Sequence, residues 1–142
     1  MAPITGVLVD TSAWGRAQTK PQVALKLREW FKARTPYTCP VLDLEILYSA
    51  RGTSEYLEWQ KRRRATFVNI PLSKAVGDRA LEVQSILATK GHLRATSLPD
   101  LLIAACAEQV GATILHYDQD YDHIADITGQ STAWIVPRGS VD

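Results

Sequence analysis

The chain has 142 residues, of which 46% are hydrophobic and 22% are charged, and its formal net charge is +1 at pH 7. This length and balance are typical of one globular domain and exclude a disordered or collagen-like chain. A net charge so close to zero also excludes a strong basic field over the whole surface, so any contact with nucleic acid must use a local patch.

Extended apolar runs alternate with helical patterns along the chain, which predicts an α/β domain with a mainly parallel central sheet. The first run, residues 6–10, is apolar on both faces before Asp10 and is therefore expected to be a central strand. Further extended segments are expected at 37–39, 66–70 and 112–117, and an edge strand at 133–136. Helices are expected at 22–32, 40–50 and 54–64, from a cap at Ser73 to about residue 90, from a cap at Ser97 to 109, and after Thr11 or Ser12, either of which could be the N-cap.

The chain also lacks the marks of an exported or membrane protein. No apolar run approaches the ~18 residues of a membrane span, and residues 1–10 lack the basic region and long apolar stretch of a signal peptide. Cys39 and Cys106 form neither a disulfide framework nor a zinc ribbon, and they suit a reducing cytosol. We therefore expect a cytoplasmic protein with a single domain over residues 1–142, in which 137–142 form a flexible tail.

Two aspartates directly follow expected strands. Asp10 comes after Val7-Leu8-Val9, and Asp118 comes after the run 112–117. Because sites in open parallel sheets form outside the carboxyl ends of the strands, these two carboxylates could meet in one cleft. Taken singly, each is more simply explained as a turn or helix-capping residue.

Two more acidic residues lie within apolar helical segments. Glu45 stands in the segment 41–48, and a glutamate on the core-facing side of a helix is unfavourable unless it is paired or bound to a cation. A rotated helix would instead leave Glu45 in solvent. Asp100 could form a capping box with Ser97, but the helix after it carries no charge up to residue 107 and should be buried nearly all round. Its first turn is then expected to point toward the strand ends.

Four carboxylates in one cleft would repel one another strongly. Two of them at about 4 Å repel by roughly 4 kcal/mol at an effective dielectric constant of about 20. They would therefore either hold protons or hold a cation. A site made only of oxygen ligands suits Mg²⁺ or Mn²⁺ better than Zn²⁺.

Other metal sites are disfavoured by the spacing of the residues. The segment 118–122 is not an EF-hand calcium loop, because His123 and Gly129 occupy the positions at which that loop requires Gly and Glu. The three histidines, which include His92 and His116, have no zinc-site spacing and no neighbouring cysteine.

Four acidic segments follow one another in a recognisable order. They are Asp10-Thr11-Ser12-Ala13-Trp14, Glu45 in an aliphatic helix, Asp100-Leu101-Leu102-Ile103-Ala104-Ala105, and Asp118-Gln119-Asp120-Tyr121. In this order and at these separations the chain resembles the PIN-domain ribonucleases over nearly its whole length, and most closely the VapC-type toxins of bacterial toxin–antitoxin pairs. The resemblance implies a three-layer α/β/α sandwich and RNA cleavage that depends on Mg²⁺ or Mn²⁺.

The resemblance also implies roles for individual residues. The catalytic, metal-binding acidic positions are matched by Asp10, Glu45, Asp100 and Asp118, and Asp120 matches a fifth, more variable metal position. Thr11 or Ser12 would supply the hydroxyl that follows the first aspartate and supports the site. Tyr121 stands where relatives often have Phe.

The partners implied by the resemblance are an RNA substrate, a VapB-like antitoxin lying across a groove and blocking the cleft, and a second copy of the toxin in a homodimer. Because water would attack the phosphodiester, we expect products with 5′-phosphate and 3′-hydroxyl ends. Some of the four tryptophans could line such a partner groove, since aromatic residues are enriched at interfaces.

A basic run is a candidate for RNA contact. It comprises Lys61, Arg62, Arg63 and Arg64, and Arg51 could join it. The alternative is a solvated helix end, where cations are favoured by the helix dipole.

Two other functions stay open at this point. A catalytically inactive PIN-like module could bind RNA or protein, although all four acidic positions are filled. A phosphotransferase that forms an aspartyl phosphate could use Asp10, but such enzymes usually carry a second Asp two residues later, where this chain has Ser12.

Overall fold

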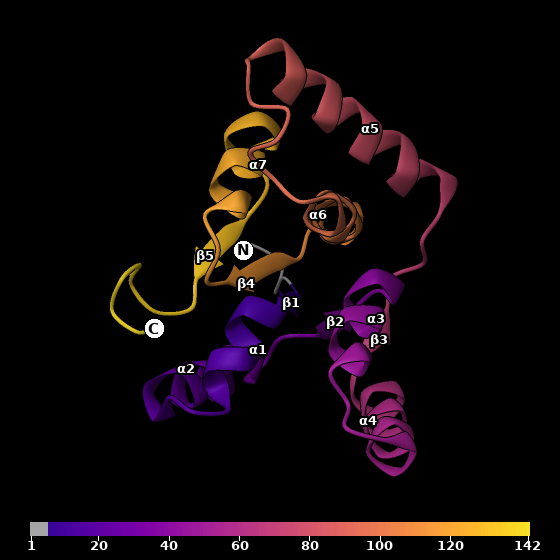
Figure 1. Ribbon diagram of the computed structural model, residues 1–142, viewed down its shortest axis with the longest axis vertical. Helices are drawn as coiled ribbons and strands as arrows, with labels where there is room; N and C mark the ends of the chain where they lie inside the picture. Colours follow the sequence, from indigo (N-terminus) through magenta and orange to yellow (C-terminus); the bar gives the residue numbers. More distant parts are fainter. Residues whose placement is uncertain (1–5) are drawn as a thin grey trace.

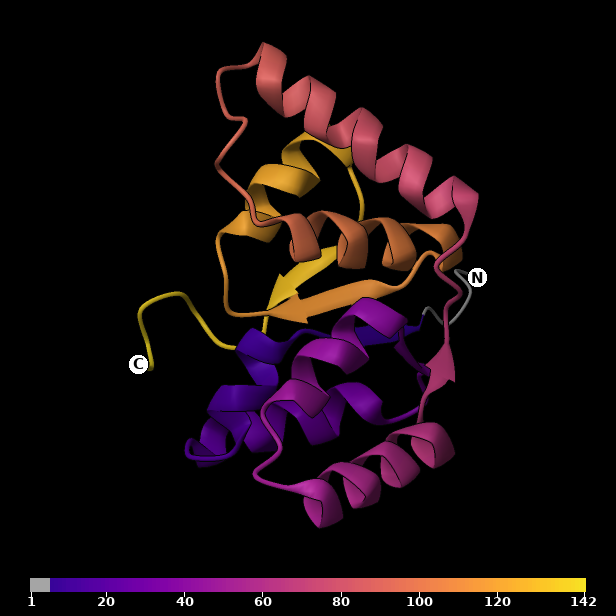
Figure 2. The same ribbon diagram turned by 45° about the vertical axis from the view of Figure 1, so that its right-hand side comes forward.

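A five-stranded parallel sheet forms the centre of the molecule (Figures 1 and 2). The computed structural model describes residues 6–142. Residues 1–5 lie outside the described residues, and they are part of the segment 1–10 in which no signal peptide is expected. The strands are β1 (Val7–Val9), β2 (Pro36–Thr38), β3 (Val68–Asn69), β4 (Thr113–His116) and β5 (Thr132–Trp134). Their order is β3-β2-β1-β4-β5 and each pairing is parallel, so β1 is central and β5 lies at an edge, as expected.

Seven helices surround the sheet within residues 6–142. They are α1 (Thr11–Ala17), α2 (Pro21–Phe31), α3 (Pro40–Tyr48), α4 (Thr53–Thr66), α5 (Lys74–Thr89), α6 (Leu98–Val110) and α7 (Asp120–Thr128). Two differences from the expected elements stand out. Helix α4 continues to Thr66, so the strand expected at 66–70 shrinks to β3, and α7 was not expected at all.

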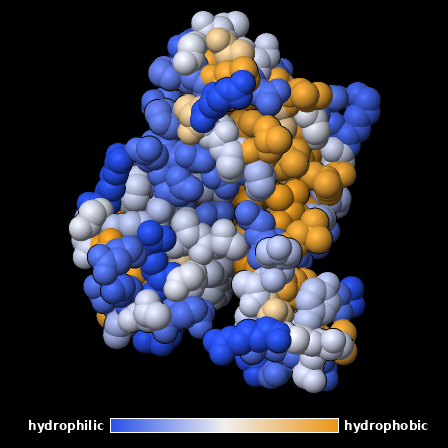
Figure 3. Space-filling view, viewed as in Figure 1, coloured by the Kyte–Doolittle hydropathy of each residue, from blue (hydrophilic) through white to orange (hydrophobic). Residues whose placement is uncertain are grey.

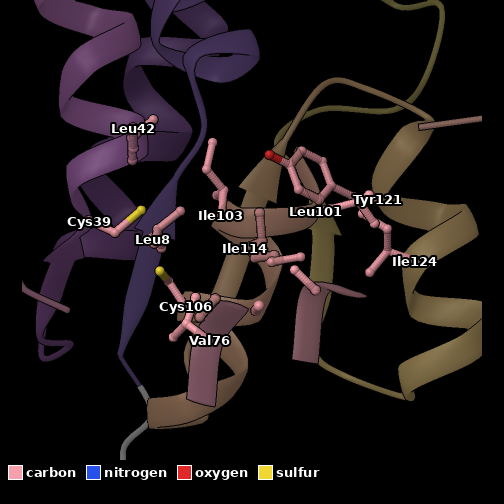
Figure 4. Close-up of a cluster of buried hydrophobic side chains, with 14 of the residues drawn as sticks. Leu8, Cys39, Leu42, Val76, Leu101, Ile103, Cys106, Ile114, Tyr121 and Ile124 are labelled. Atoms are coloured by element: carbon pink, nitrogen blue, oxygen red, sulfur yellow. The ribbon is translucent and has the colours of Figure 1, made fainter. Parts of the chain in front are cut away.

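The alternation of side chains in β1 divides the core into two layers. Val7 and Val9 pack against α1 and α2, whereas Leu8 faces α3 and α6. Figure 4 shows Leu8 beside Leu42, with both cysteines of the chain close by. All three β1 side chains are buried, and each buried aliphatic side chain stabilises the fold by about 1.5–3 kcal/mol. The molecule is thus the α/β/α sandwich that the sequence predicts.

Helix α6 crosses the interior as expected. Leu101 and Ile103–Ala107 are all buried, which explains why this stretch of the helix carries no charge. The helix starts at the carboxyl edge of the sheet, with Ser97 as its N-cap, and ends at Gly111, whose positive φ of 66° suits glycine. Its first turn therefore brings Asp100 to the strand ends.

The C-terminal segment 137–142 returns to β4 and contacts Tyr117, the residue after that strand. The Tyr117 hydroxyl donates to the carbonyl oxygen of Val141 at 2.7 Å and accepts from the backbone N–H of Gly139 at 2.7 Å. Both cysteines are free and buried, and within residues 6–142 no helix has the length and apolar character needed to cross a membrane.

Candidate active site

Asp10 and Asp100 meet at the carboxyl edge of the sheet. Asp10 follows β1 directly and is 2% exposed, and Asp100 lies in the first turn of α6 and is 6% exposed. The hydroxyl of Tyr121 is 2.8 Å from Asp10 Oδ1 and 3.1 Å from Asp100 Oδ1. Two carboxylates that are 90 positions apart in the sequence thus share one hydrogen-bond donor.

Asp10 has a second role as the N-cap of α1. Its Oδ2 accepts from the backbone N–H of Ser12 at 3.0 Å and from the Ser12 hydroxyl at 2.6 Å. The expectation that Thr11 or Ser12 caps this helix is wrong, because β1 ends at Val9 and Thr11 is already helical. This cap satisfies a backbone N–H in the first turn of α1 that has no partner within the helix.

Of the two hydroxyls expected to support the site, the one that touches Asp10 belongs to Ser12. The Ser12 hydroxyl also accepts from the backbone N–H of Tyr117 at 2.9 Å. It therefore ties the start of α1 to the end of β4. Thr11 instead lines the groove described below.

Three carboxylates form the tightest group. Oxygen atoms of Asp100, Asp118 and Asp120 all lie within 4.8 Å of one another. The backbone holds two of them in place, because Asp118 Oδ1 accepts from the N–H of Asp120 at 2.9 Å and Asp120 Oδ2 accepts from the N–H of Ser97 at 3.0 Å. This all-oxygen set fits a hard divalent cation such as Mg²⁺.

The electrostatics of the group agree with that fit. Burial, reinforced by the charge of Asp10, raises the pKa of Asp100 to about 8. Burial likewise raises the pKa of Asp118. Neighbouring carboxylates that resist ionisation become favourable anions when a cation lies between them.

Glu45 borders this group from α3 but does not belong to it. Burial and then the charge of Asp10 raise the pKa of Glu45. Its Oε1 is buried and has no hydrogen-bond partner within residues 6–142. A buried acceptor of this kind requires a water or a cation. Asp10 also lies outside the 4.8 Å group and joins it through Tyr121.

A groove of about 1060 Å³ opens beside Glu45 between α1, α3 and α4. Figure 3 shows this hollow between the part of the surface formed by α1 and α2 and the part formed by α4. Aromatic residues make up much of its wall, namely Trp14, Phe31, Trp59 and Phe67. Two of the four tryptophans, Trp14 and Trp59, thus line this groove.

Helical geometry splits the basic run of α4. Arg62 and Arg63 line the groove together with Arg51, whereas Lys61 and Arg64 are exposed on other faces of the helix. Each residue of a helix is rotated by about 100° from the one before, so four consecutive cations cannot share one face.

Arg63 is a structural residue, and this differs from the RNA contact expected for it. Its Nε donates to Asp43 Oδ1 at 2.7 Å and its Nη2 donates to the Thr38 hydroxyl at 3.1 Å. The guanidinium also lies over the ring of Phe67, and only 11% of the side chain is exposed. Arg63 therefore fastens α4 to α3 and β2.

Two residues at the site were not assigned a role from the sequence. Tyr121 contributes a hydroxyl, and His116 accepts the backbone N–H of Asp118 at 3.1 Å through Nδ1. Burial lowers the pKa of His116 and so favours the neutral ring that this hydrogen bond requires. The sequence feature that could have indicated a role for His116 is its place in an apolar strand, two residues before Asp118.

Comparison with known proteins gives a consistent result. A family model described as the PIN domain matches residues 7–127. Ribonuclease VapC18 of Mycobacterium tuberculosis is 41% identical over 138 residues, covering 94% of this chain and 97% of that protein. Ribonuclease VapC51 of the same organism is 39% identical over 137 residues, covering 95% and 96%.

Solved structures resemble the fold. VapBC-1 from nontypeable Haemophilus influenzae has a TM-score of 0.73 at 12% identity and covers 91% of this chain and 97% of that chain. VapBC2 from Rickettsia felis, bound to a DNA fragment from its promoter, has a TM-score of 0.71 at 17% identity, with coverages of 89% and 96%. At these identities the likeness concerns the fold alone.

The substitution Asp100→Asn should stabilise the metal-free protein at alkaline pH. Because burial raises the folded-state pKa of Asp100 from 3.8 to about 8, the folded state binds more protons than the unfolded state between these values. Its stability should therefore fall as pH rises through this window. In the variant, the free energy of unfolding should decrease less with pH. At pH 8 the variant should melt at a higher temperature than the unmodified protein, by about 4 °C for each kcal/mol of repulsion removed.

Thermal unfolding in a chelator between pH 5 and pH 9 tests this expectation. Asp126→Asn, an exposed change on α7, is the matched control and should leave the pH dependence as it is. An Asp100→Asn protein that melts below the unmodified protein at pH 8 would contradict the assigned electrostatics.

Removing Arg63 should destabilise the fold, whereas removing its neighbour Arg62 should not. Arg63→Ala deletes two hydrogen bonds and leaves Asp43 half-buried without its cation, a loss of about 2 kcal/mol. Arg62 makes only an exposed pair with Glu58, which contributes about 0–1 kcal/mol. Urea unfolding of the two variants measures the difference, and equal midpoints would refute the structural role of Arg63.

Proposed function

This chain belongs to the PIN domain family, and on that premise we propose that it is a metal-dependent endoribonuclease that hydrolyses RNA phosphodiester bonds. We further propose that it is the toxin of a toxin–antitoxin pair. The proposal is supported by relatives named ribonucleases that match nearly the whole chain. The structural observation that carries it is the convergence of Asp100, Asp118 and Asp120, with Asp10 tied to them through Tyr121.

The residues proposed to hold the cation are Asp10, Glu45, Asp100, Asp118 and Asp120. Mg²⁺ or Mn²⁺ bound there would offset charge developing on the phosphate and make a water more acidic. The protein's own contribution is positional. Ser12 and Tyr121 fix the orientation of the Asp10 carboxylate, and the backbone N–H of Ser97 fixes that of Asp120.

Glu45 is the proposed proton acceptor. Its Oε1 has no partner within residues 6–142 and its pKa is raised, and both properties suit a general base that takes a proton from the attacking water. In the proposed step water attacks phosphorus, the bond from phosphorus to the 3′-oxygen breaks, and the 3′-oxygen leaves and is protonated. The products are a 5′-phosphate and a 3′-hydroxyl.

A VapB-like antitoxin is the proposed inhibitor. The VapBC structures from Rickettsia felis and Haemophilus influenzae share this fold, and the aromatic groove of this chain runs to Glu45. A segment lying in that groove would cover Glu45 and keep RNA from the carboxylates. The aromatic wall would supply the apolar anchors that interfaces of this kind use.

A homodimer is also proposed, and exposed apolar side chains support it. Leu44, Tyr48 and Leu81 are all more than half exposed on α3 and α5. Figure 3 shows apolar surface between these two helices. We place the protein in the cytoplasm, in keeping with its two free, buried cysteines.

Cleavage of RNA by the purified protein tests the proposed reaction. Activity should require Mg²⁺ or Mn²⁺, disappear in EDTA, and fall by several orders of magnitude in Asp10→Asn, because that change removes a carboxylate from the cluster. Sequencing of the new RNA ends should find 5′-phosphates. Asp126→Asn, which is exposed on α7, is the control and should retain activity.

Full activity in EDTA, or products with 2′,3′-cyclic phosphates, would refute metal-assisted hydrolysis. Mn²⁺ binding without any cleavage would instead favour an inactive module that binds RNA or protein.

The salt dependence of RNA binding tests the basic side of the groove. In an Asp10→Asn background, Arg62→Ala should reduce the slope of log affinity against log salt by about 0.7, the value for one lost phosphate contact to a single strand. Arg64→Ala is the matched control, because Arg64 lies outside the groove on the same helix. An identical slope in both variants would place the RNA elsewhere.

A further inference from the structure

We infer that Tyr121 is a positioning residue, whose hydroxyl links the carboxylates of Asp10 and Asp100 and fixes both in the orientation in which they hold a cation. This inference rests on the proposed function and names a residue beyond its acidic set.

The ring of Tyr121 is anchored in the core. The residue is 0% exposed and belongs to the apolar cluster that also contains Leu101 and Ile124. Figure 4 shows Tyr121 beside both residues, with its oxygen at the end of the ring away from Ile124. The ring of His116 packs against it at 5.1 Å between centroids. Because these neighbours hold the ring, the position of its hydroxyl oxygen is fixed.

One proton serves two acceptors at this hydroxyl. Oδ1 of Asp10 and Oδ1 of Asp100 are 2.8 Å and 3.1 Å from the same oxygen, and a tyrosine hydroxyl carries a single hydrogen. The hydroxyl lies between two carboxyl groups that would otherwise face each other in a buried site. It therefore holds one oxygen of each group at hydrogen-bond distance from the same point.

Hydrogen bonds fix the orientation of both carboxylates. Asp10 uses Oδ2 for Ser12 and Oδ1 for Tyr121, so that its plane cannot rotate. Asp100 is fixed at Oδ1, and its carboxylate also lies in the 4.8 Å group with Asp118 and Asp120. Tyr121 is thus the connection between that group and Asp10.

The physical consequence is an effect on cation affinity. Partners that hydrogen-bond to metal-ligating side chains hold them in the binding geometry, and their removal typically weakens metal binding by about tenfold to a hundredfold. A residue that only filled core space would have no such effect when an isosteric Phe replaced it.

Mn²⁺ titration calorimetry on the purified full-length protein tests the inference. Tyr121→Phe should weaken Mn²⁺ binding by about tenfold or more, with an unchanged circular dichroism spectrum. Tyr117→Phe is the matched control, because it deletes a partly buried tyrosine hydroxyl that bonds to the C-terminal segment and not to a carboxylate. This control should bind Mn²⁺ as the unmodified protein does.

A spectroscopic measurement gives an independent readout, which starts from the unmodified protein. Mg²⁺ added to the unmodified protein should change its near-ultraviolet tyrosine difference spectrum, since the Tyr121 hydroxyl contacts two of the proposed ligands. The change should persist in Tyr117→Phe and vanish in Tyr121→Phe.

The outcomes separate this inference from the proposed function. Equal or tighter Mn²⁺ binding by Tyr121→Phe, or an unaltered tyrosine spectrum in a protein that binds Mg²⁺, overturns the positioning role and leaves the nuclease proposal intact. Failure of the unmodified protein to bind Mn²⁺ overturns the metal site of the proposed function and the inference with it.

Discussion

Repulsion among buried carboxylates at one edge of the sheet is the constraint on which the rest of the structure depends. Helices α1, α6 and α7 all begin at this edge, so that the partial positive charges of three helix N-termini point toward the acidic residues. Backbone N–H groups and hydroxyls also donate hydrogen bonds to these carboxylates at closer range, as Ser12 does to Asp10. Without these donors, the carboxyl groups of Asp10 and Asp100 could not remain nearly buried next to each other.

The sequence predicts those features of the site that have a strong local pattern. Asp10 could be placed because a wholly apolar strand ends at it, and Asp100 because an uncharged helix follows it. The rotation of α4 could not be derived, since its sequence has no clear apolar face and its contacts with Thr38 and Asp43 are set by tertiary packing. Helix α7 was missed because Gln119 provides no side-chain cap, although Asp120 and Asp122 in its first turn are typical of a helix start.

The groove and the acidic cluster lie next to each other at Glu45. Its side chain lines the groove, and burial and the charge of Asp10 raise the pKa of its carboxylate. The aromatic wall suits apolar groups of a partner, whereas the carboxylates suit a cation. A single partner that occupies the wall can therefore control access to the cluster without competing for the cation itself.

Tyr117 ties the segment 137–142 to the carboxyl end of β4. Its hydroxyl binds Gly139 and Val141, while its backbone N–H binds the Ser12 hydroxyl that supports Asp10. Any displacement of this segment would consequently act on a residue that is two hydrogen bonds away from the first carboxylate.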